Sequence, residues 1–118
     1  MSIGQKTIFL VDDDMINMAI GNDTLGRLYK TFTMNSGYHL LKMLESNIPD
    51  LILLDVEMPV MNGYETIEIL KSREETRNIP VIFLTAHNDT ESELKGLSMG
   101  AVDYIIKPFS PPLLLKRI

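Results

Sequence analysis

The chain has 118 residues, no cysteine and a formal net charge of −5. This length fits one domain with its own hydrophobic core, so we expect residues 1–118 to form a single domain. Without cysteine the chain has no disulfides, thiolate metal sites or thiol nucleophiles, and its acidic balance argues against direct nucleic-acid binding. No apolar stretch approaches the ~20 residues of a membrane span, and the N-terminus lacks a signal-peptide pattern. The composition therefore predicts a soluble, cytoplasmic domain that does not contact a membrane.

Four short apolar runs predict the strands of a buried parallel sheet: residues 8–11, 51–54, 81–84 and 104–106. Each run is continuously apolar, which is typical of strands that are covered on both faces. A weaker run at residues 30–34 alternates polar and apolar side chains, so we expect it at an edge of the sheet. The sequence therefore predicts five strands.

Five segments are predicted to be helical: residues 15–28, 38–44, 64–73, 91–99 and a last helix that begins at Pro111. Each follows a side chain that can cap a helix N-terminus, namely Asp14, Ser36, Asn62, the 88–90 cluster and Ser110. Glu65 completes a capping-box pattern with Asn62. Gly21 and Gly26 lie in the first helix, where each internal glycine costs about 1 kcal/mol relative to alanine, so an irregular helix is expected there.

The alternation of strand and helix predicts a doubly wound α/β domain with helices on both faces of the sheet and right-handed crossovers. The last helix has barely two turns before Ile118. We therefore expect the chain to be a piece of a longer protein, although a short natural terminus is the alternative.

Polar residues follow four of the five predicted strands. Three aspartates (12–14) follow the first strand, Asp55 the third, Thr85 the fourth and Lys107 the fifth. Taken singly, each has an ordinary explanation as a helix cap, a turn residue or a solvated cation. Because ligands bind beyond the carboxyl ends of parallel strands, their shared position favours a functional site at that edge.

The chemistry of this set points to a divalent cation and a phosphoryl group. Closely spaced carboxylates raise one another's pKa unless a positive charge is supplied, and Mg²⁺ binds one or two carboxylates while keeping several waters. The sequence offers no histidine or cysteine cluster for zinc. A lysine and a hydroxyl at the same edge would hold the remaining phosphoryl oxygens, with Asp55 as an in-line nucleophile.

In this order the residues resemble the receiver domain of two-component response regulators, of the chemotaxis-regulator type. The resemblance covers essentially the whole chain and rests on VDDD at 11–14, LLDVEMPVMNG at 53–63, TA at 85–86, GAVDY at 100–104 and KPF at 107–109. It implies a five-stranded parallel sheet in the flavodoxin-like order 2-1-3-4-5 and a phosphorylatable signalling switch.

The resemblance implies that Asp55 accepts a phosphoryl group from a histidine kinase or a phosphotransfer protein. It implies that Mg²⁺, or Mn²⁺ in its place, binds Asp13, Asp55 and the backbone carbonyl of Glu57, and that Asp12 contributes through a bound water. On this interpretation the chain is a regulatory domain that promotes its own phosphorylation and dephosphorylation, not an enzyme with a separate substrate.

Lys107, the Thr85 hydroxyl and the backbone amide of Ala86 are implied to hold the phosphoryl group. Tyr104 matches the aromatic residue that turns inward when the threonine moves toward the phosphate, and the Lys107–Pro108 peptide is expected to be cis. The surface that responds would comprise the fourth helix, the fifth strand and the fifth helix. It would control an output partner or a C-terminal effector domain beyond this chain, or form a homodimer.

Three other interpretations stay open on the residues alone. A Mg²⁺-dependent phosphatase or phosphotransferase with an aspartyl nucleophile generally has a second aspartate two residues later, where this chain has Glu57. A flavodoxin-like cofactor binder has a hydroxyl- and glycine-rich loop after the first strand, where this chain has three aspartates. A receiver that is no longer phosphorylated is the third, although all the expected polar residues are present.

Two further features are not explained by the common pattern. Glu57 occupies a position that is neutral in many relatives, and His87 either reaches Glu57 across the site or is simply an exposed loop residue. We hypothesise that these two residues set the lifetime of the phosphorylated form. The leucines at 113–115 span more than one helix face, so at least one should be exposed, either for a partner or dimer or for a following segment.

Overall fold

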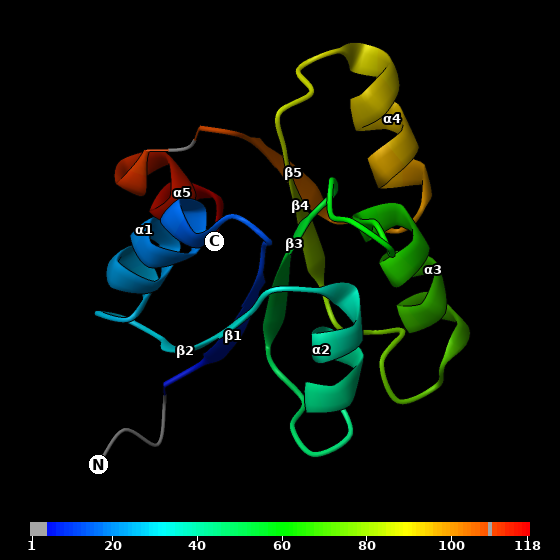
Figure 1. The fold of residues 1–118 in the computed structure, drawn as a ribbon, viewed down its shortest axis with the longest axis horizontal. Helices are drawn as coiled ribbons and strands as arrows, with labels where there is room; N and C mark the ends of the chain where they lie inside the picture. Colours follow the sequence, from blue (N-terminus) through cyan, green and yellow to red (C-terminus); the bar gives the residue numbers. More distant parts are fainter. Residues whose placement is uncertain (1–4, 109) are drawn as a thin grey trace.

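The five predicted strands form one parallel sheet. The structure is a computed structural model and describes residues 5–108 and 110–118. Its strands are β1 (Thr7–Val11), β2 (Lys30–Met34), β3 (Leu51–Asp55), β4 (Val81–Thr85) and β5 (Asp103–Ile106). They lie in the order β2-β1-β3-β4-β5 with every neighbouring pair parallel (Figure 1). The predicted strand order is confirmed, and the alternating strand β2 lies at an edge as its pattern indicates.

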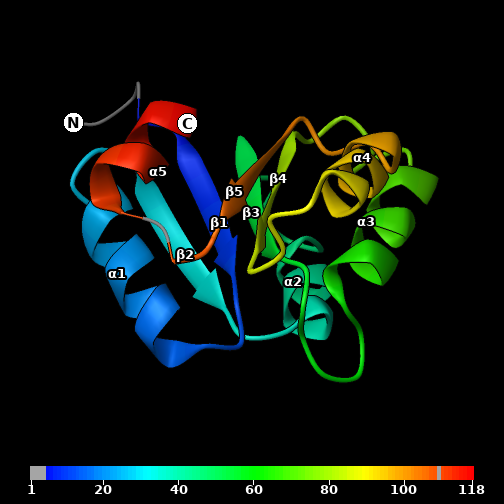
Figure 2. The ribbon, with the colours of Figure 1, turned by 90° about the horizontal axis from the view of Figure 1, so that it is seen from above.

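Five helices cover the two faces of the sheet. They are α1 (Met15–Leu25), α2 (Gly37–Met43), α3 (Gly63–Ser72), α4 (Thr90–Ser98) and α5 (Pro111–Arg117). Helices α1 and α5 lie on one face, and α2, α3 and α4 lie on the other (Figures 1 and 2). The predicted doubly wound architecture is therefore confirmed. Within the described residues, no helix combines the length and the apolar character that a membrane crossing requires.

Four of the strands contain continuous apolar runs because their side chains point alternately to the two faces of the sheet, and both faces are covered. Successive side chains of a strand point to opposite faces of the sheet. In β1, Phe9 and Val11 belong to the core that includes side chains of α2 and α3, whereas Ile8 and Leu10 belong to the core that includes side chains of α1 and α5. The central strands divide in the same way, so both faces of the sheet need apolar residues.

Polar side chains cap the helices where the sequence predicts. The N-caps Asp14, Ser36, Asn62, Asp89 and Ser110 each accept a hydrogen bond from an amide in the first turn. Asn62 and Glu65 form the predicted capping box. These bonds use amides that would otherwise lack a partner, so the starts of the helices are encoded locally.

The predicted end of the first helix at Leu28 is wrong, because α1 ends at Leu25. Gly26 is the C-cap, and the amides of Leu28 and Tyr29 both donate to the Leu25 carbonyl in a closing turn. The other helix limits agree with the predicted ranges to within a residue at each end.

Two glycines allow helices to approach the sheet closely. A Cβ on Gly21 would lie 2.6 Å from Leu10 Cδ2, so this glycine lets α1 rest on β1. A Cβ on Gly63 would collide with the backbone of Asp55 and Val56. The first residue of α3 therefore packs directly against the end of β3, where Asp55 lies.

Candidate functional site

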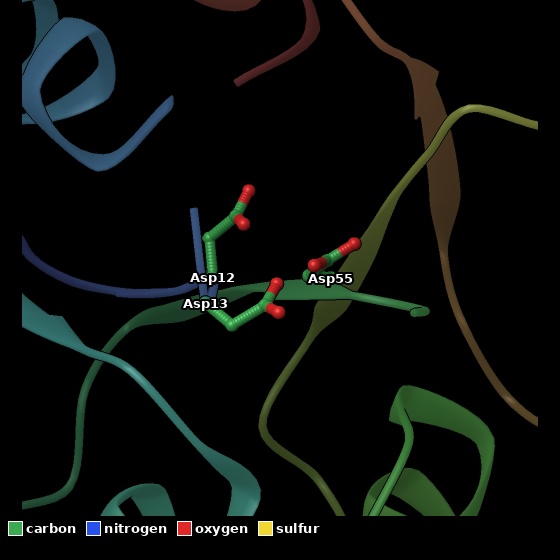
Figure 3. Close-up of side chains that lie close together, drawn as sticks. All are labelled: Asp12, Asp13 and Asp55. Atoms are coloured by element: carbon green, nitrogen blue, oxygen red, sulfur yellow. The ribbon is translucent and has the colours of Figure 1, made fainter. Parts of the chain in front are cut away.

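The carboxyl ends of β1 and β3 bring three aspartates together. Val11 pairs with Leu54 in the β1–β3 register, so the residues that follow β1 lie beside Asp55 at the end of β3. Carboxylate oxygens of Asp12, Asp13 and Asp55 lie within 4.8 Å of one another. Figure 3 shows the three carboxylates gathered at this edge of the sheet. The acidic cluster that the sequence predicts is therefore present.

Lys107 reaches the same cluster from the end of β5. Its Nζ donates to Asp55 Oδ1 at 3.0 Å and to Asp12 Oδ2 at 3.4 Å. Its backbone amide donates to the Thr85 carbonyl at 2.7 Å, which fixes the lysine backbone against the end of β4. The lysine side chain is 15% exposed and the two aspartates are at most 1% exposed. Because solvent barely screens these pairs, the charges of Lys107, Asp55 and Asp12 act on one another more strongly than charges in surface ion pairs do.

The remaining part of the predicted lysine motif is only partly described. The Lys107–Pro108 peptide is cis, which confirms the prediction. Phe109, the last residue of the KPF segment, lies outside the described residues.

Burial controls the protonation of Asp55. The pKa of Asp55 is raised from its ordinary 3.8 to about 7, because burial, together with the charge of Asp12, outweighs the hydrogen bond and charge of Lys107, which lower it. For Lys107, burial alone would lower the pKa, but the hydrogen bonds and charges of Asp55 and Asp12 raise it above its ordinary value. Near neutral pH the charge of Asp55 is therefore sensitive to any further cation at the cluster.

The donor set fits a hard divalent cation. Asp55 Oδ1 accepts from Lys107 and, at 3.3 Å, from the Glu57 amide, whereas Asp55 Oδ2 is buried without a hydrogen-bond partner among the described residues. A buried carboxylate oxygen without a partner is destabilising unless another group satisfies it. Three clustered carboxylates supply only oxygen ligands, which Mg²⁺ prefers. These residues can therefore hold such an ion.

The predicted phosphoryl-binding and switch residues lie at the same edge. Thr85 is buried at the end of β4, and its hydroxyl accepts from the His87 amide at 3.0 Å. Ala86 follows it in an exposed loop. Tyr104 of β5 is 8% exposed, and its hydroxyl donates to the His87 carbonyl. The tyrosine ring therefore points into the molecule and not into solvent.

Glu57 and His87 contact each other beside the acidic cluster. The His87 Nε2 pairs with a Glu57 carboxylate oxygen, and both side chains are about half exposed. The two alternatives for His87 are thus both partly right, because it lies in an exposed loop and reaches Glu57. The pair lines an open groove of about 860 Å³ between the loops that follow β3 and β4, with Tyr64 and Lys95 on its wall.

Sequence analysis missed two apolar side chains beside this edge. Met15 and Ile16 begin α1 directly after the acidic turn, and they are 80% and 71% exposed. A signal was available, because neighbouring helical residues point about 100° apart and both cannot face the sheet. Large exposed apolar side chains of this kind are typical of an interaction surface.

Comparisons with known proteins agree with this geometry. The family model described as "Response regulator receiver domain" matches residues 8–118. A probable cyclic di-GMP phosphodiesterase from Vibrio cholerae is 43% identical over 116 residues, which cover 98% of this chain but 26% of that protein. The chain spans between 26% and 51% of the length of the first six curated relatives.

Solved structures give the same result. The chemotaxis protein CheY4 of Vibrio cholerae has a TM-score of 0.90 at 29% identity, covering 96% of this chain and 95% of that one. The receiver domain of the sensor histidine kinase PA1611 from Pseudomonas aeruginosa, solved with a magnesium ion in its active-site cleft, has a TM-score of 0.86 at 29% identity over 96% of this chain and 93% of that one. The chain belongs to the response regulator receiver family, the phosphorylatable regulatory domains of two-component signalling.

Proposed function

We infer that Asp55 accepts a phosphoryl group from the phosphohistidine of a histidine kinase or phosphotransfer protein, in a reaction that depends on Mg²⁺. The observation that carries this inference is the buried Asp55 carboxylate, which Lys107 holds through Oδ1 while Oδ2 has no partner. In the proposed step a carboxylate oxygen of Asp55 forms a bond to phosphorus as the phosphorus–nitrogen bond breaks. The electron pair of that bond stays with the imidazole of the donor.

The acidic cluster supports a metal-assisted reaction. We assign Asp13, Asp55 and the backbone carbonyl of Glu57 as ligands, with Asp12 contributing through a water, and Mn²⁺ as an alternative ion. The ion would neutralise charge on the carboxylates and on the transferring phosphoryl oxygens. Magnesium in the cleft of the PA1611 receiver domain supports the assignment by similarity.

The residues around Asp55 would then position the phosphoryl group. Lys107 already lies 3.0 Å from Asp55 and carries a positive charge for the phosphoryl oxygens. The Thr85 hydroxyl and the Ala86 amide would donate to the same oxygens. The chain's own side chains thus promote both phosphorylation and the later attack of water, and residues 1–118 act as one receiver domain.

Phosphorylation would act on the surface formed by α4, β5 and α5. Phosphate adds about −1.5 to −2 charges at the strand ends, which favours a shift of Thr85 toward the phosphate and so further stabilises the inward position of the Tyr104 ring. On this surface Leu97, Ile106 and Leu113 are partly exposed and line a hollow of about 170 Å³. We assign this surface to the binding of an output partner, a second copy of the domain or an effector domain. The probable cyclic di-GMP phosphodiesterase of Vibrio cholerae is about four times as long as the aligned region, so it has room for such a domain.

The start of α1 would contact the phosphodonor protein. A donor histidine has to come within bonding distance of Asp55, so the donor must cover the residues around the acidic cluster. Met15 and Ile16 are the large exposed apolar side chains that adjoin Asp13 and Asp14 in the chain. Their burial against an apolar donor surface would add affinity without taking part in the chemistry.

A labelling experiment tests the proposed function. The protein is incubated with acetyl phosphate and Mg²⁺, and intact mass is compared between the wild type and Asp55→Asn. We expect a gain of one phosphoryl group in the wild type only, and no gain when EDTA replaces the metal. Labelling of Asp55→Asn to the same extent would contradict the assignment. Multiple turnover of a generic phosphate ester, or bound flavin in the purified protein, would favour the enzyme or cofactor-binding alternatives.

A further inference from the structure

His87 connects the three segments that carry the proposed switch. Its amide donates to the Thr85 hydroxyl at 3.0 Å, and its carbonyl accepts from the Tyr104 hydroxyl. Its imidazole pairs with Glu57, which belongs to the loop that follows β3. One residue therefore contacts the end of β4, the aromatic ring on β5 and the loop next to Asp55.

Core packing does little to fix the loop in which His87 lies. The loop leads into α4, where Gly96 is the only buried residue. Gly96 rests on the ring of Phe83, and Lys95 lies 4.3 Å from the ring centre of Tyr64 as a second connection to neighbouring elements. Elements with so few buried side chains open and shift at low free-energy cost. Contacts at the start of α4 therefore have a large effect on its position.

The inward position of Tyr104 depends on this loop. A buried hydroxyl needs a hydrogen-bond partner, and the His87 carbonyl is the partner in this structure. If the loop moves away, the hydroxyl loses its acceptor and the ring gains by turning toward water. The position of His87 and the position of Tyr104 are thus linked.

We propose that the pairing of Glu57 with His87, called here the 57–87 bridge, holds the loop after β4 in place and keeps Tyr104 inward before Asp55 is phosphorylated. An N–H on Nε2 is sufficient for the bridge, and both the imidazolium and one neutral tautomer provide it. The unphosphorylated domain is then already biased toward the surface with Tyr104 inward. This inference rests on the proposed function only for the biological meaning of that surface.

The exposure of the Tyr104 ring, measured without a phosphodonor, tests the bridge. Tyrosine rings are labelled with ¹³C, and their relaxation by a neutral gadolinium chelate is recorded in EDTA, with Tyr104→Phe to assign the signal. Tyr38, which is 62% exposed, serves as the internal reference for an exposed ring. The variants are Glu57→Ala, His87→Ala, the double variant and the conservative Glu57→Gln, with His39→Ala as the matched control on exposed α2 surface.

We expect the relaxation of Tyr104 to rise about threefold in Glu57→Ala and in His87→Ala, the size expected for loss of a half-exposed ion pair. The double variant should rise no further than either single variant, because both remove the same bridge. Glu57→Gln, which keeps an acceptor for the imidazole, should stay near the wild type, and His39→Ala should not change. Thermal unfolding identifies any variant that is destabilised globally.

Two results would overturn the proposal. One is unchanged relaxation of Tyr104 in both single variants, and the other is a double variant that equals the sum of the singles, since the side chains would then act independently. Because no phosphodonor or metal is present, these outcomes do not depend on Asp55 chemistry. Conversely, a failure to label Asp55 would leave the measurement on Tyr104 intact.

Discussion

Asp55 has opposite requirements in folding and in reaction. Its carboxylate is 1% exposed, so ionisation removes a charge from water, whereas binding a cation and attacking phosphorus both need the ionised form. Lys107 and Asp12 act on it in opposite directions, and burial raises the pKa of Asp55 to about 7. The residue is therefore poised between its two protonation states near neutral pH.

The metal-free fold should lose stability as the pH rises through the pKa of Asp55. The folded-state pKa of about 7 lies above the ordinary 3.8, so the folded protein binds the proton more tightly than the unfolded chain. This contribution is complete below pH 3.8 and is lost as the pH rises through about 7. Urea unfolding in EDTA at pH 5 to 8 measures it, with Asp55→Asn as the reference. We expect the difference in unfolding free energy between the two proteins to change by about 1–3 kcal/mol over this range. A pH-independent difference would contradict the raised pKa.

The 57–87 bridge should also lengthen the life of the phosphorylated form. Glu57 and His87 lie over the groove beside the acidic cluster, where they can restrict the approach of water to the phosphoryl group. We expect Glu57→Ala and His87→Ala to lose phosphate more than about twofold faster than the wild type. The loss is followed by intact mass after the donor is removed, with His39→Ala as the control. Rates within twofold of the wild type would remove this hypothesis.

Val60 stores backbone strain in the loop between β3 and α3. Its φ is 71°, in the left-handed region that β-branched residues disfavour, and its side chain is 88% exposed. Replacement by glycine or asparagine relieves the strain and sacrifices little packing, so Val60→Gly and Val60→Asn should raise the unfolding free energy by about 1 kcal/mol. Urea unfolding measures the gain. The same changes at Val102, an exposed valine with ordinary φ, should give no increase, and a gain of equal size there would contradict the explanation.

Helix α3 is held firmly against the sheet beside the groove. Its first residue lies against the Asp55 backbone, its capping box fixes the first turn, and Tyr64 in that turn packs edge-on against Phe83 of β4 with ring centres 5.4 Å apart. Helix α4 has no comparable anchoring, because Gly96 is its only buried residue. Two neighbouring helices on one face of the sheet thus differ in how tightly they are held.

A side chain at Gly63 should separate α3 from the site. Gly63→Ala places a Cβ on the Asp55 carbonyl and 2.8 Å from Val56 Cα, and a backbone clash of this kind cannot be relieved by a rotamer change. We expect a loss of about 2–3 kcal/mol of unfolding free energy together with weaker phosphorylation by acetyl phosphate. Glu68→Ala, at an exposed position on the same helix, is the matched control. Equal unfolding free energies of the two variants would contradict this prediction, because α3 could then move away from β3 without loss of stability.

Across the chain, the features that could be predicted from the sequence are those to which many residues contribute. The strands were predictable because burial on both faces leaves a continuous apolar run, and the acidic cluster because parallel strands place their carboxyl ends at one edge. The 57–87 bridge could be stated only as an alternative, since a separation of 30 residues says nothing about side-chain reach. The end of α1 at Leu25 could not be predicted, because Gly26 can lie either inside a helix or at its C-cap.

The exposed start of α1 should matter for protein donors and not for small ones. Ile16→Asp places a charge in the surface that we assign to the donor, so phosphotransfer from a phosphohistidine-containing protein that labels the wild type should slow by about tenfold or more. Labelling by acetyl phosphate should be unchanged, because a small donor does not need a protein surface at the start of α1. Leu28→Asp, an exposed apolar position beyond the other end of α1, is the control. Equal slowing of phosphotransfer from the protein donor and of labelling by acetyl phosphate would contradict this prediction, because the substitution would then affect the reaction site itself.

The acidic cluster, Thr85 and Lys107 lie at one rim of the sheet, so the opposite rim takes no part in the proposed reaction. The turns at residues 26–29, 44–50, 73–80 and 99–102 connect helices back to the amino ends of strands and carry none of the assigned residues. Epitope tags or fluorescent reporters attached at exposed positions of these turns would stay away from the chemistry, and Val102, which is 61% exposed, offers such a position in the turn that follows α4. The architecture therefore offers sites for building a biosensor without altering the reaction that it reports.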